Sequence, residues 1–172
     1  MIRTAIVTVS DRSAAGRRED LSVQAVREVL AGGPFVEVDY QVVPDEQAIL
    51  RSRLRILTEG DGVDLVLTTG GTGLAMRDRT PEATLEVVER TVPGLVEAMR
   101  AAGARSDPRA WLSRAVAGVR RATLVVNLPG SPAGAKASLA AIVGVLPHAL
   151  DVIQGRRPGG SAAPAAPDDW HG

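Results

Sequence analysis

The chain contains no cysteine and only two histidines among its 172 residues. Without thiols it has neither a disulfide framework nor a thiolate metal site, and the two histidines lie far apart in the sequence. Any metal would therefore have to be held by oxygen ligands. Such ligands favour Mg²⁺ among the common protein metals.

Aromatic residues are scarce, with two tryptophans, one tyrosine and one phenylalanine. This scarcity argues against a surface on which bases stack, and it leaves Val, Leu, Ile and Ala to form the core. The formal net charge is zero, so there is no basic field of the kind that attracts nucleic acid. We therefore expect small molecules or other proteins as partners, and no nucleic acid.

Long apolar runs are also missing, and none approaches the ~20 residues needed to span a membrane. A strand-like pattern begins at Arg3, with no charged segment and apolar core of the type found in secretion signals. These features predict a cytoplasmic protein that does not interact with membranes. The length suits one domain, which we place at residues 1–156, followed by a Pro-, Gly-, Ala- and Ser-rich tail at 157–172 that we predict to be disordered.

Short β-branched runs alternate with helical stripes along this domain. We predict strands at residues 3–9, 36–43, 65–69, 115–119 and 122–126, the last two forming a hairpin. We predict helices at residues 19–31 and 46–57, one beginning at residue 81, two marked by apolar residues between 85 and 102, and a long last helix from residue 132 that Pro147 kinks. This alternation indicates a parallel sheet between two layers of helices. A short turn at residues 109–112 is expected to bring Trp111 inside.

The most informative stretch is residues 65–84, where a buried strand runs into Gly70-Gly71-Thr72-Gly73. Glycines remove the Cβ atoms that would keep backbone N–H groups away from an anion. Thr80 followed by Pro81 is typical of a helix N-cap and first helical residue. We interpret the stretch as a phosphate-binding turn, with alanine at Gly71 costing about 1 kcal/mol if the position needs a positive φ.

Each of two aspartates near this turn can be explained either by function or by local structure. If Thr80 caps the helix, Asp78 is free for metal or proton chemistry, and the alternative is that it caps a turn in a solvated loop. Asp45 is well placed to cap the second helix, which by itself explains an aspartate there.

Two further loops follow strand ends, where an open α/β sheet binds ligands. Residues 10–12 come after the first strand, although an ordinary charged turn explains them equally well. Residues 127–132 have the same features as the glycine turn. Gly130 allows a ligand to approach the backbone, Ser131 is expected to cap the next helix, and Pro132 starts that helix, whose N-terminus favours an anion. The two glycine loops are expected to face one crevice.

Residues 68–73, with Arg77, Asp78 and residues 80–84, strongly resemble the signature loop of the MogA/MoaB family, the molybdopterin adenylyltransferases of molybdenum cofactor biosynthesis. The loop is neither a Walker loop nor Gly-x-Gly-x-x-Gly. Similarity continues at residues 6–12, 43–46, 112–115 and 127–132, so that it covers residues 3–155.

The resemblance implies the MoCF domain fold, a three-layer α/β/α sandwich with a mostly parallel, mixed five-stranded sheet, assembled as a homotrimer or hexamer. It implies transfer of AMP from ATP to the terminal phosphate of molybdopterin with release of pyrophosphate, with Mg²⁺ as cofactor and hand-over of the product to a molybdenum insertase. It leaves open the MogA or MoaB branch and whether molybdenum or tungsten is the destination metal.

The resemblance also implies roles for individual residues. Asp45 and Asp78 would be the catalytic and metal-binding residues. The substrate-binding residues would be Ser10, Asp11, Arg12, Thr69, Gly70, Gly71, Thr72, Gly73, Arg77, Ser113, Arg114, Asn127, Pro129, Gly130, Ser131 and Pro132. The pterin would lie near the first glycine loop and the nucleotide near the second, although the sequence does not decide which loop holds which ligand.

Two other functions are to be weighed. One is a non-catalytic molybdopterin-binding scaffold of the same fold, and the other is a phosphatase or kinase that shares only the crevice. Loss of either aspartate would favour the scaffold, and both Asp45 and Asp78 are present. With no further domain in this chain, multidomain versions such as molybdenum insertases and CinA-like proteins are disfavoured.

Overall fold

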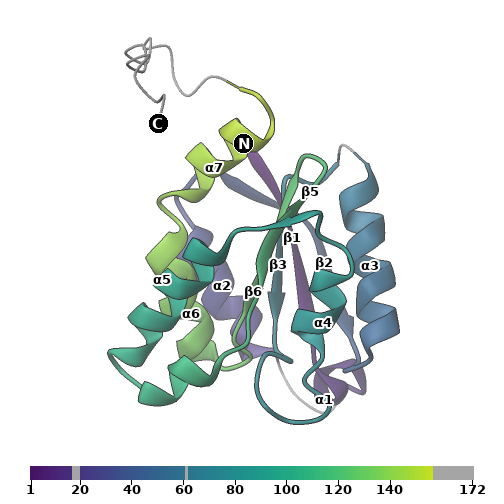
Figure 1. Cartoon of the computed structure of the whole chain (residues 1–172), viewed down its shortest axis with the longest axis vertical. Coiled ribbons are helices and arrows are strands. Elements are labelled where there is room, and N and C mark those ends of the chain that lie inside the picture. Colours follow the sequence, from purple (N-terminus) through teal and green to yellow (C-terminus); the bar gives the residue numbers. More distant parts are fainter. Residues whose placement is uncertain (17–19, 61, 157–172) are drawn as a thin grey trace, which may run out of the picture.

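The computed structural model describes residues 1–16, 20–60 and 62–156. A mixed sheet lies between two layers of helices, as Figure 1 shows, which confirms the predicted three-layer α/β/α fold. The strands are β1 Ile2–Val9, β2 Phe35–Val43, β3 Leu65–Thr69, β4 Arg90–Thr91, β5 Ala117–Arg120 and β6 Thr123–Leu128. The helices are α1 Asp11–Ala14, α2 Leu21–Leu30, α3 Gln47–Glu59, α4 Thr80–Leu85, α5 Pro93–Ala104, the 3₁₀ helix η1 Pro108–Leu112, α6 Pro132–Ile142 and α7 Leu146–Ile153. The predicted tail and helix position 19 lie outside the described residues.

The sheet has the order β2-β1-β3-β6-β5-β4. Strands β2, β1, β3 and β6 are parallel, while β5 is antiparallel to both β6 and β4. The described part of the chain thus has six strands where five were expected. The additional strand is β4, in a segment we had assigned to a helix on the basis of Val88 and Val92. Helix α4 stops at Leu85 instead, and the following segment pairs with β5, where the N–H groups of Glu89 and Val92 donate to the carbonyl oxygens of Val119 and Ala117.

Alternating strand residues supply two hydrophobic cores, one on each face of the sheet. One core joins residues such as Ile6, Leu67 and Val126 to α2, α5, α6 and α7. The other joins Val7 and Val66 to α3 and α4. A parallel strand in such a sandwich is buried on both faces, which suits apolar and β-branched residues. This explains why all five residues of β3 are buried and why its bounds agree with the prediction.

Two local predictions near the end of the chain were wrong in detail. Trp111 does not enter the core but has 59% of its surface exposed, because η1 is too short to bury it. The long last helix is in fact two helices, α6 and α7, which meet at 63°. Pro147 stands at the start of α7, where proline is well tolerated, rather than inside a kinked helix. The predicted hairpin of β5 and β6 is confirmed.

Among the described residues, no single helix is both long and apolar enough to cross a membrane. Only the bent pair of α6 and α7 has sufficient length and apolar composition when taken together. The apolar residues of that pair, including Leu139, Ile142, Leu146 and Leu150, are part of the core on the sheet.

Candidate active site

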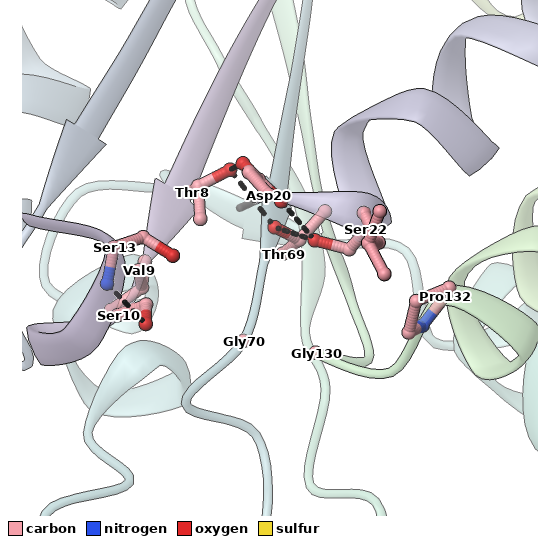
Figure 2. Close-up of a pocket in the computed structure, with 11 residues that line it drawn as sticks. Thr8, Val9, Ser10, Ser13, Asp20, Ser22, Thr69, Gly70, Gly130 and Pro132 are labelled. Carbon is pink, nitrogen blue, oxygen red and sulfur yellow. Dashed lines mark hydrogen bonds between the residues drawn. The ribbon is translucent and has the colours of Figure 1, made fainter. Parts of the chain in front are cut away.

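The order of the strands places a ligand crevice between β1 and β3. From β1 the chain passes through α2 to β2, which lies on one side of β1 in the sheet. From β2 it passes through α3 to β3, which lies on the opposite side of β1. Such a reversal opens a crevice at the carboxyl ends of the two strands. A small polar cavity of about 40 Å³ lies there (Figure 2). Residues at the ends of β1 and β3 and in the loops that follow line it, among them Thr8, Ser10, Thr69, Gly70, Gly130 and Pro132.

The first glycine loop is shaped by its own packing. Gly70 and Gly71 have φ values of +94° and +67°, which confirms that this turn needs left-handed backbone. A Cβ on Gly70 would lie 2.4 Å from the carbonyl oxygen of Val9, and one on Gly71 would lie 2.3 Å from Oγ1 of Thr80. Protein atoms therefore occupy the space on these two residues that we had reserved for a ligand phosphate.

Thr80 was predicted to be the N-cap of α4, but its side chain bonds to the first glycine loop instead. Its hydroxyl donates a hydrogen bond to the carbonyl oxygen of Gly70 (2.9 Å), and its N–H donates to that of Gly71 (3.1 Å). The N-cap position of α4 belongs to Arg79, whose side chain makes no capping hydrogen bond. A threonine hydroxyl bonds equally well to any nearby carbonyl, and here the glycine turn brings one within reach.

The second loop lies beside the first, which confirms the expectation that both face one crevice. The N–H of Gly70 donates to the carbonyl oxygen of Leu128 (3.1 Å), and a Cβ on Gly130 would lie 3.1 Å from Cα of Gly70. Ser131 caps α6 as predicted, accepting a hydrogen bond from the N–H of Gly134 (3.1 Å). The N-terminus of α6 thus borders the same crevice as the glycine turn. Pro132 has no N–H and Ser131 accepts those of Gly134 and Ala135, which leaves the N–H of Ala133 for an anion.

Two carboxylates, Asp11 and Asp45, clamp the loops after β1 and β2 together. The N–H of Asp45 donates to Oδ1 of Asp11 (2.9 Å), and the N–H of Asp11 donates to Oδ2 of Asp45 (3.0 Å). Arg77 forms an ion pair with Asp11 at 2.6 Å. Asp45 was expected to cap α3, but the N-cap is Glu46 and has no side-chain capping bond. The carboxylate of Asp45 is directed to the loop instead.

Asp45 and Asp78 both lie against the first glycine loop. A Cβ on Gly71 would be 3.6 Å from Oδ1 of Asp45, and one on Gly73 would be 2.8 Å from Oδ2 of Asp78. Asp78 also accepts a hydrogen bond from the N–H of Ala75 (3.0 Å), which is the turn-capping contact that we had considered. The residues predicted to be catalytic are therefore brought to one place.

The carboxyl group of Asp45 has a pKa raised above its ordinary value. Burial is the largest cause, and the negative charges of Asp11 and Asp78 add to it. The backbone hydrogen bond from Asp11 and the charge of Arg77 act in the opposite direction without cancelling the effect. The site thus concentrates negative charge at Asp45, and a cation bound there would lower the pKa of this group.

Several predicted substrate-binding residues have protein partners instead. Asn127 is fully buried, and its amide bonds to the hydroxyls of Thr68 (3.0 Å) and Thr84 (2.9 Å) and to the N–H of Val116 (3.1 Å). Asn127 therefore holds β6 to its neighbours and does not line the crevice. Arg114 is bonded to the first glycine loop. Arg12 is exposed on α1.

A larger, mostly apolar cavity of about 620 Å³ opens beside both loops, between α5, η1 and α6. Four predicted residues line it: Thr72 and Gly73 of the first loop, and Pro129 and Ser131 of the second. Ser113 lines it too, which supports its prediction as a site residue, while Val96 and Met99 form part of its apolar wall. An apolar cavity of this size with a few polar groups at its rim suits a flat organic ring system.

The sequence reasoning missed Asp20, which organises the floor of the small cavity. Its carboxylate accepts hydrogen bonds from the hydroxyls of Thr8, Tyr40 (2.5 Å) and Ser22 (2.7 Å) and from the N–H of Val23 (3.1 Å), as Figure 2 shows in part. Burial acts to raise the pKa of Asp20, but these hydrogen bonds outweigh it and lower the pKa. An aspartate just before the stripe of α2 was a recognisable N-cap signal.

Tyr40 gives a direct test of this network because it is the only tyrosine in the chain. Burial, followed by the hydrogen bond to Asp20, raises the pKa of Tyr40 to about 12. Absorbance at 295 nm after a stopped-flow pH jump should show this pKa before alkaline unfolding occurs. Asp20→Asn should lower it toward the ordinary value of about 10. A wild-type tyrosine that titrates near its ordinary value would show that the bond to Asp20 does not form.

The fold and the site together define an α/β protein that binds anionic ligands where parallel strands end. A family model described as "Probable molybdopterin binding domain" matches residues 5–148. The molybdopterin adenylyltransferase of Helicobacter pylori (strain J99) is 40% identical over 156 residues, which cover 90% of this chain and 89% of that protein. The protein of the same name from Escherichia coli K12 is 43% identical over 141 residues, 80% of this chain and 72% of that protein.

The crystal structure of the molybdopterin biosynthesis enzyme MoaB of Thermus thermophilus superposes with a TM-score of 0.86 at 56% identity. The match covers 91% of this chain and 98% of that one. The chain therefore belongs to the family of molybdopterin-binding MoCF domains, as the resemblance indicated.

Proposed function

We propose that this protein is a molybdopterin adenylyltransferase of molybdenum cofactor biosynthesis. The observation that carries the proposal is the meeting of two anion-ready loops with the carboxylates of Asp45 and Asp78 in one crevice. The curated relatives described above support the assignment because they match most of the chain. Two anion-ready loops suit two phosphate-bearing substrates, which a phosphatase with a single substrate would not have.

In the reaction, an oxygen of the terminal phosphate of molybdopterin attacks the α-phosphorus of ATP. The new P–O bond forms as the bond from that phosphorus to the bridging α–β oxygen breaks, and pyrophosphate leaves. The N–H of Ala133 at the start of α6 would bind one phosphate group, and the backbone N–H groups of Thr72 and Gly73, beyond the packed Gly70 and Gly71, would bind the other. We place a ring system of one substrate in the apolar cavity, which borders both loops.

The donor atoms of the site fit Mg²⁺ as the cofactor. Asp45 and Asp78 offer carboxylate oxygens. Burial raises the pKa of Asp45 and the charges of Asp11 and Asp78 add to this, so a divalent cation there would favour the ionised carboxylate. The described residues contain no group of three or more His, Asp or Glu side chains arranged to hold a metal alone. This agrees with Mg²⁺, which commonly uses one or two carboxylates together with substrate phosphates. Bound there, Mg²⁺ would offset the repulsion between the two anionic substrates.

The protein's own groups would then orient the substrates. Asp11 holds the backbone of Asp45, and Arg77 neutralises Asp11. Thr80 fixes Gly70 and Gly71, so that the loop is rigid before a ligand arrives. Preorganised groups of this kind lower the barrier because they do not reorganise during the reaction. We also propose, from the family resemblance, a cytoplasmic homotrimer that hands its product to a molybdenum insertase.

The test is to incubate the purified protein with Mg²⁺, ATP and molybdopterin and to identify the products by mass spectrometry. We expect adenylylated molybdopterin and pyrophosphate in equal amounts. Binding of molybdopterin without turnover, under conditions where the Escherichia coli relative is active, would favour the scaffold function. Hydrolysis of ATP without transfer would favour a generic phosphate-dependent enzyme.

A further inference from the structure

The guanidinium group of Arg114 is committed to the protein itself. Its Nε donates to the carbonyl oxygen of Gly73 (2.8 Å), and one terminal nitrogen donates to the carbonyl oxygen of Asp78 (2.6 Å). The other terminal nitrogen forms an ion pair with Glu82 on α4. The N–H of Arg114 adds a fourth bond, to the carbonyl oxygen of Thr72 (2.9 Å). All three side-chain nitrogens therefore have partners in the segment 72–82.

These contacts divide the signature loop into two parts with separate fastenings. Thr80 holds Gly70 and Gly71 at the start of the loop. Arg114 holds Gly73 and Asp78 at either end of the later part. The carboxylate of Asp78 accepts a hydrogen bond from the N–H of Ala75, within this later part. The position of its carboxylate thus depends on Arg114 through the backbone of residue 78.

The ion pair with Glu82 sets the direction of the guanidinium group. The bond from Arg114 is the largest cause of the lowered pKa of Glu82, so the carboxylate is charged and fixes one edge of the planar group. The planar fork of arginine then presents its other N–H groups to two carbonyl oxygens at once. Lysine, a single compact cation, cannot reproduce this geometry.

We propose that Arg114 is a positioning residue that holds Asp78 in its productive place, and that it does not bind substrate. This inference rests on the proposed function, because it assigns Arg114 to the reaction of the same site. It differs from the role implied by the resemblance, in which Arg114 contacts the ligand. The two roles predict different kinetics, since loss of a ligand contact weakens binding whereas misplacement of Asp78 slows the chemical step.

The test uses Arg114→Lys and Arg114→Ala, with Arg3→Ala as a matched control. Arg3 also forms a bidentate ion pair, with the buried Asp64, but at the opposite end of the strands. We expect kcat to fall about 10- to 100-fold in both Arg114 variants, as is typical when a reacting group is displaced by about 1 Å. The dissociation constants of ATP and molybdopterin should change less than about threefold. Millimolar guanidinium should restore part of kcat to Arg114→Ala only.

Hydrogen exchange separates failure of this inference from failure of the proposed function. In both Arg114 variants, the hydrogen-bonded amides of Ala75 and Asp78 should exchange faster while that of Thr80 stays protected, and Arg3→Ala should show neither change. Weakened substrate binding with unchanged kcat would overturn the positioning role in favour of substrate contact. Unchanged exchange at Ala75 and Asp78 would overturn it even if the wild-type protein proved inactive, because exchange does not require turnover.

Discussion

Asp78→Asn is expected to lower the rate of adenylyl transfer by about two orders of magnitude or more while the fold persists. The amide oxygen of asparagine can still accept the hydrogen bond from the N–H of Ala75, so the turn keeps its capping contact. What the substitution removes is the negative charge beside the glycine loop. Asp45→Asn should behave similarly, since its amide oxygen can still accept from the N–H of Asp11.

The measurement is kcat under saturating substrates together with the melting temperature of each variant. Asp151→Asn on α7 serves as the control, because it removes a carboxylate outside the crevice. It should leave kcat unchanged. If Asp78→Asn lowered the melting temperature and left kcat intact, the aspartate would serve only the turn.

Gly71→Ala is expected to destabilise the first loop strongly. The positive φ costs alanine about 1 kcal/mol, and forcing a methyl group against Thr80 adds about 1–3 kcal/mol, for a total of about 2–4 kcal/mol. This exceeds the cost expected from the sequence, because the structure shows Oγ1 of Thr80 only 2.3 Å from the new Cβ. Shifting Thr80 would also disturb the bonds that hold Gly70 and Gly71.

Gly32→Ala is the matched control, because Gly32 has φ +78° but no atom within 4 Å of the position that an added Cβ would take. It should therefore show only the backbone cost. The free energy of unfolding of both variants, and of Gly71→Ala combined with Thr80→Ala, can be measured by chemical denaturation. The comparison separates the cost of the positive φ from the cost of the steric clash with Thr80. The double variant should lose less stability than the two single losses added together. Equal losses of unfolding free energy in Gly71→Ala and Gly32→Ala would show that the contact with Thr80 adds nothing to the cost of the positive φ.

Much of the backbone of the site could be predicted from the sequence. The apolar run before Gly70 predicted β3, and the glycines after it predicted a turn, in which Gly70 and Gly71 have positive φ. Ser131 followed by Pro132 predicted the start of α6 correctly. Because both loops follow parallel strands, their meeting at one edge was also predictable.

Side-chain partners could not be predicted in this way. Thr80 and Asp45 both stand where caps are expected, but tertiary neighbours compete with the local helix for their oxygens. Asn127 has an amide side chain of the kind that often binds ligands, yet this amide bonds to Thr68 on β3 and to the N–H of Val116. Arg114 bonds to residues more than 30 positions away in sequence, and no local pattern specifies such contacts.

The central claim is that one crevice brings the α-phosphate of ATP to the terminal phosphate of molybdopterin. The most direct measurement follows ³²P from ATP labelled at the α-phosphate during incubation with the wild-type protein, Mg²⁺ and molybdopterin. We expect the label to appear in the pterin product, with one unlabelled pyrophosphate released for each transfer. Label that stays in ATP, or that appears only as free AMP in the presence of molybdopterin, would contradict the claim.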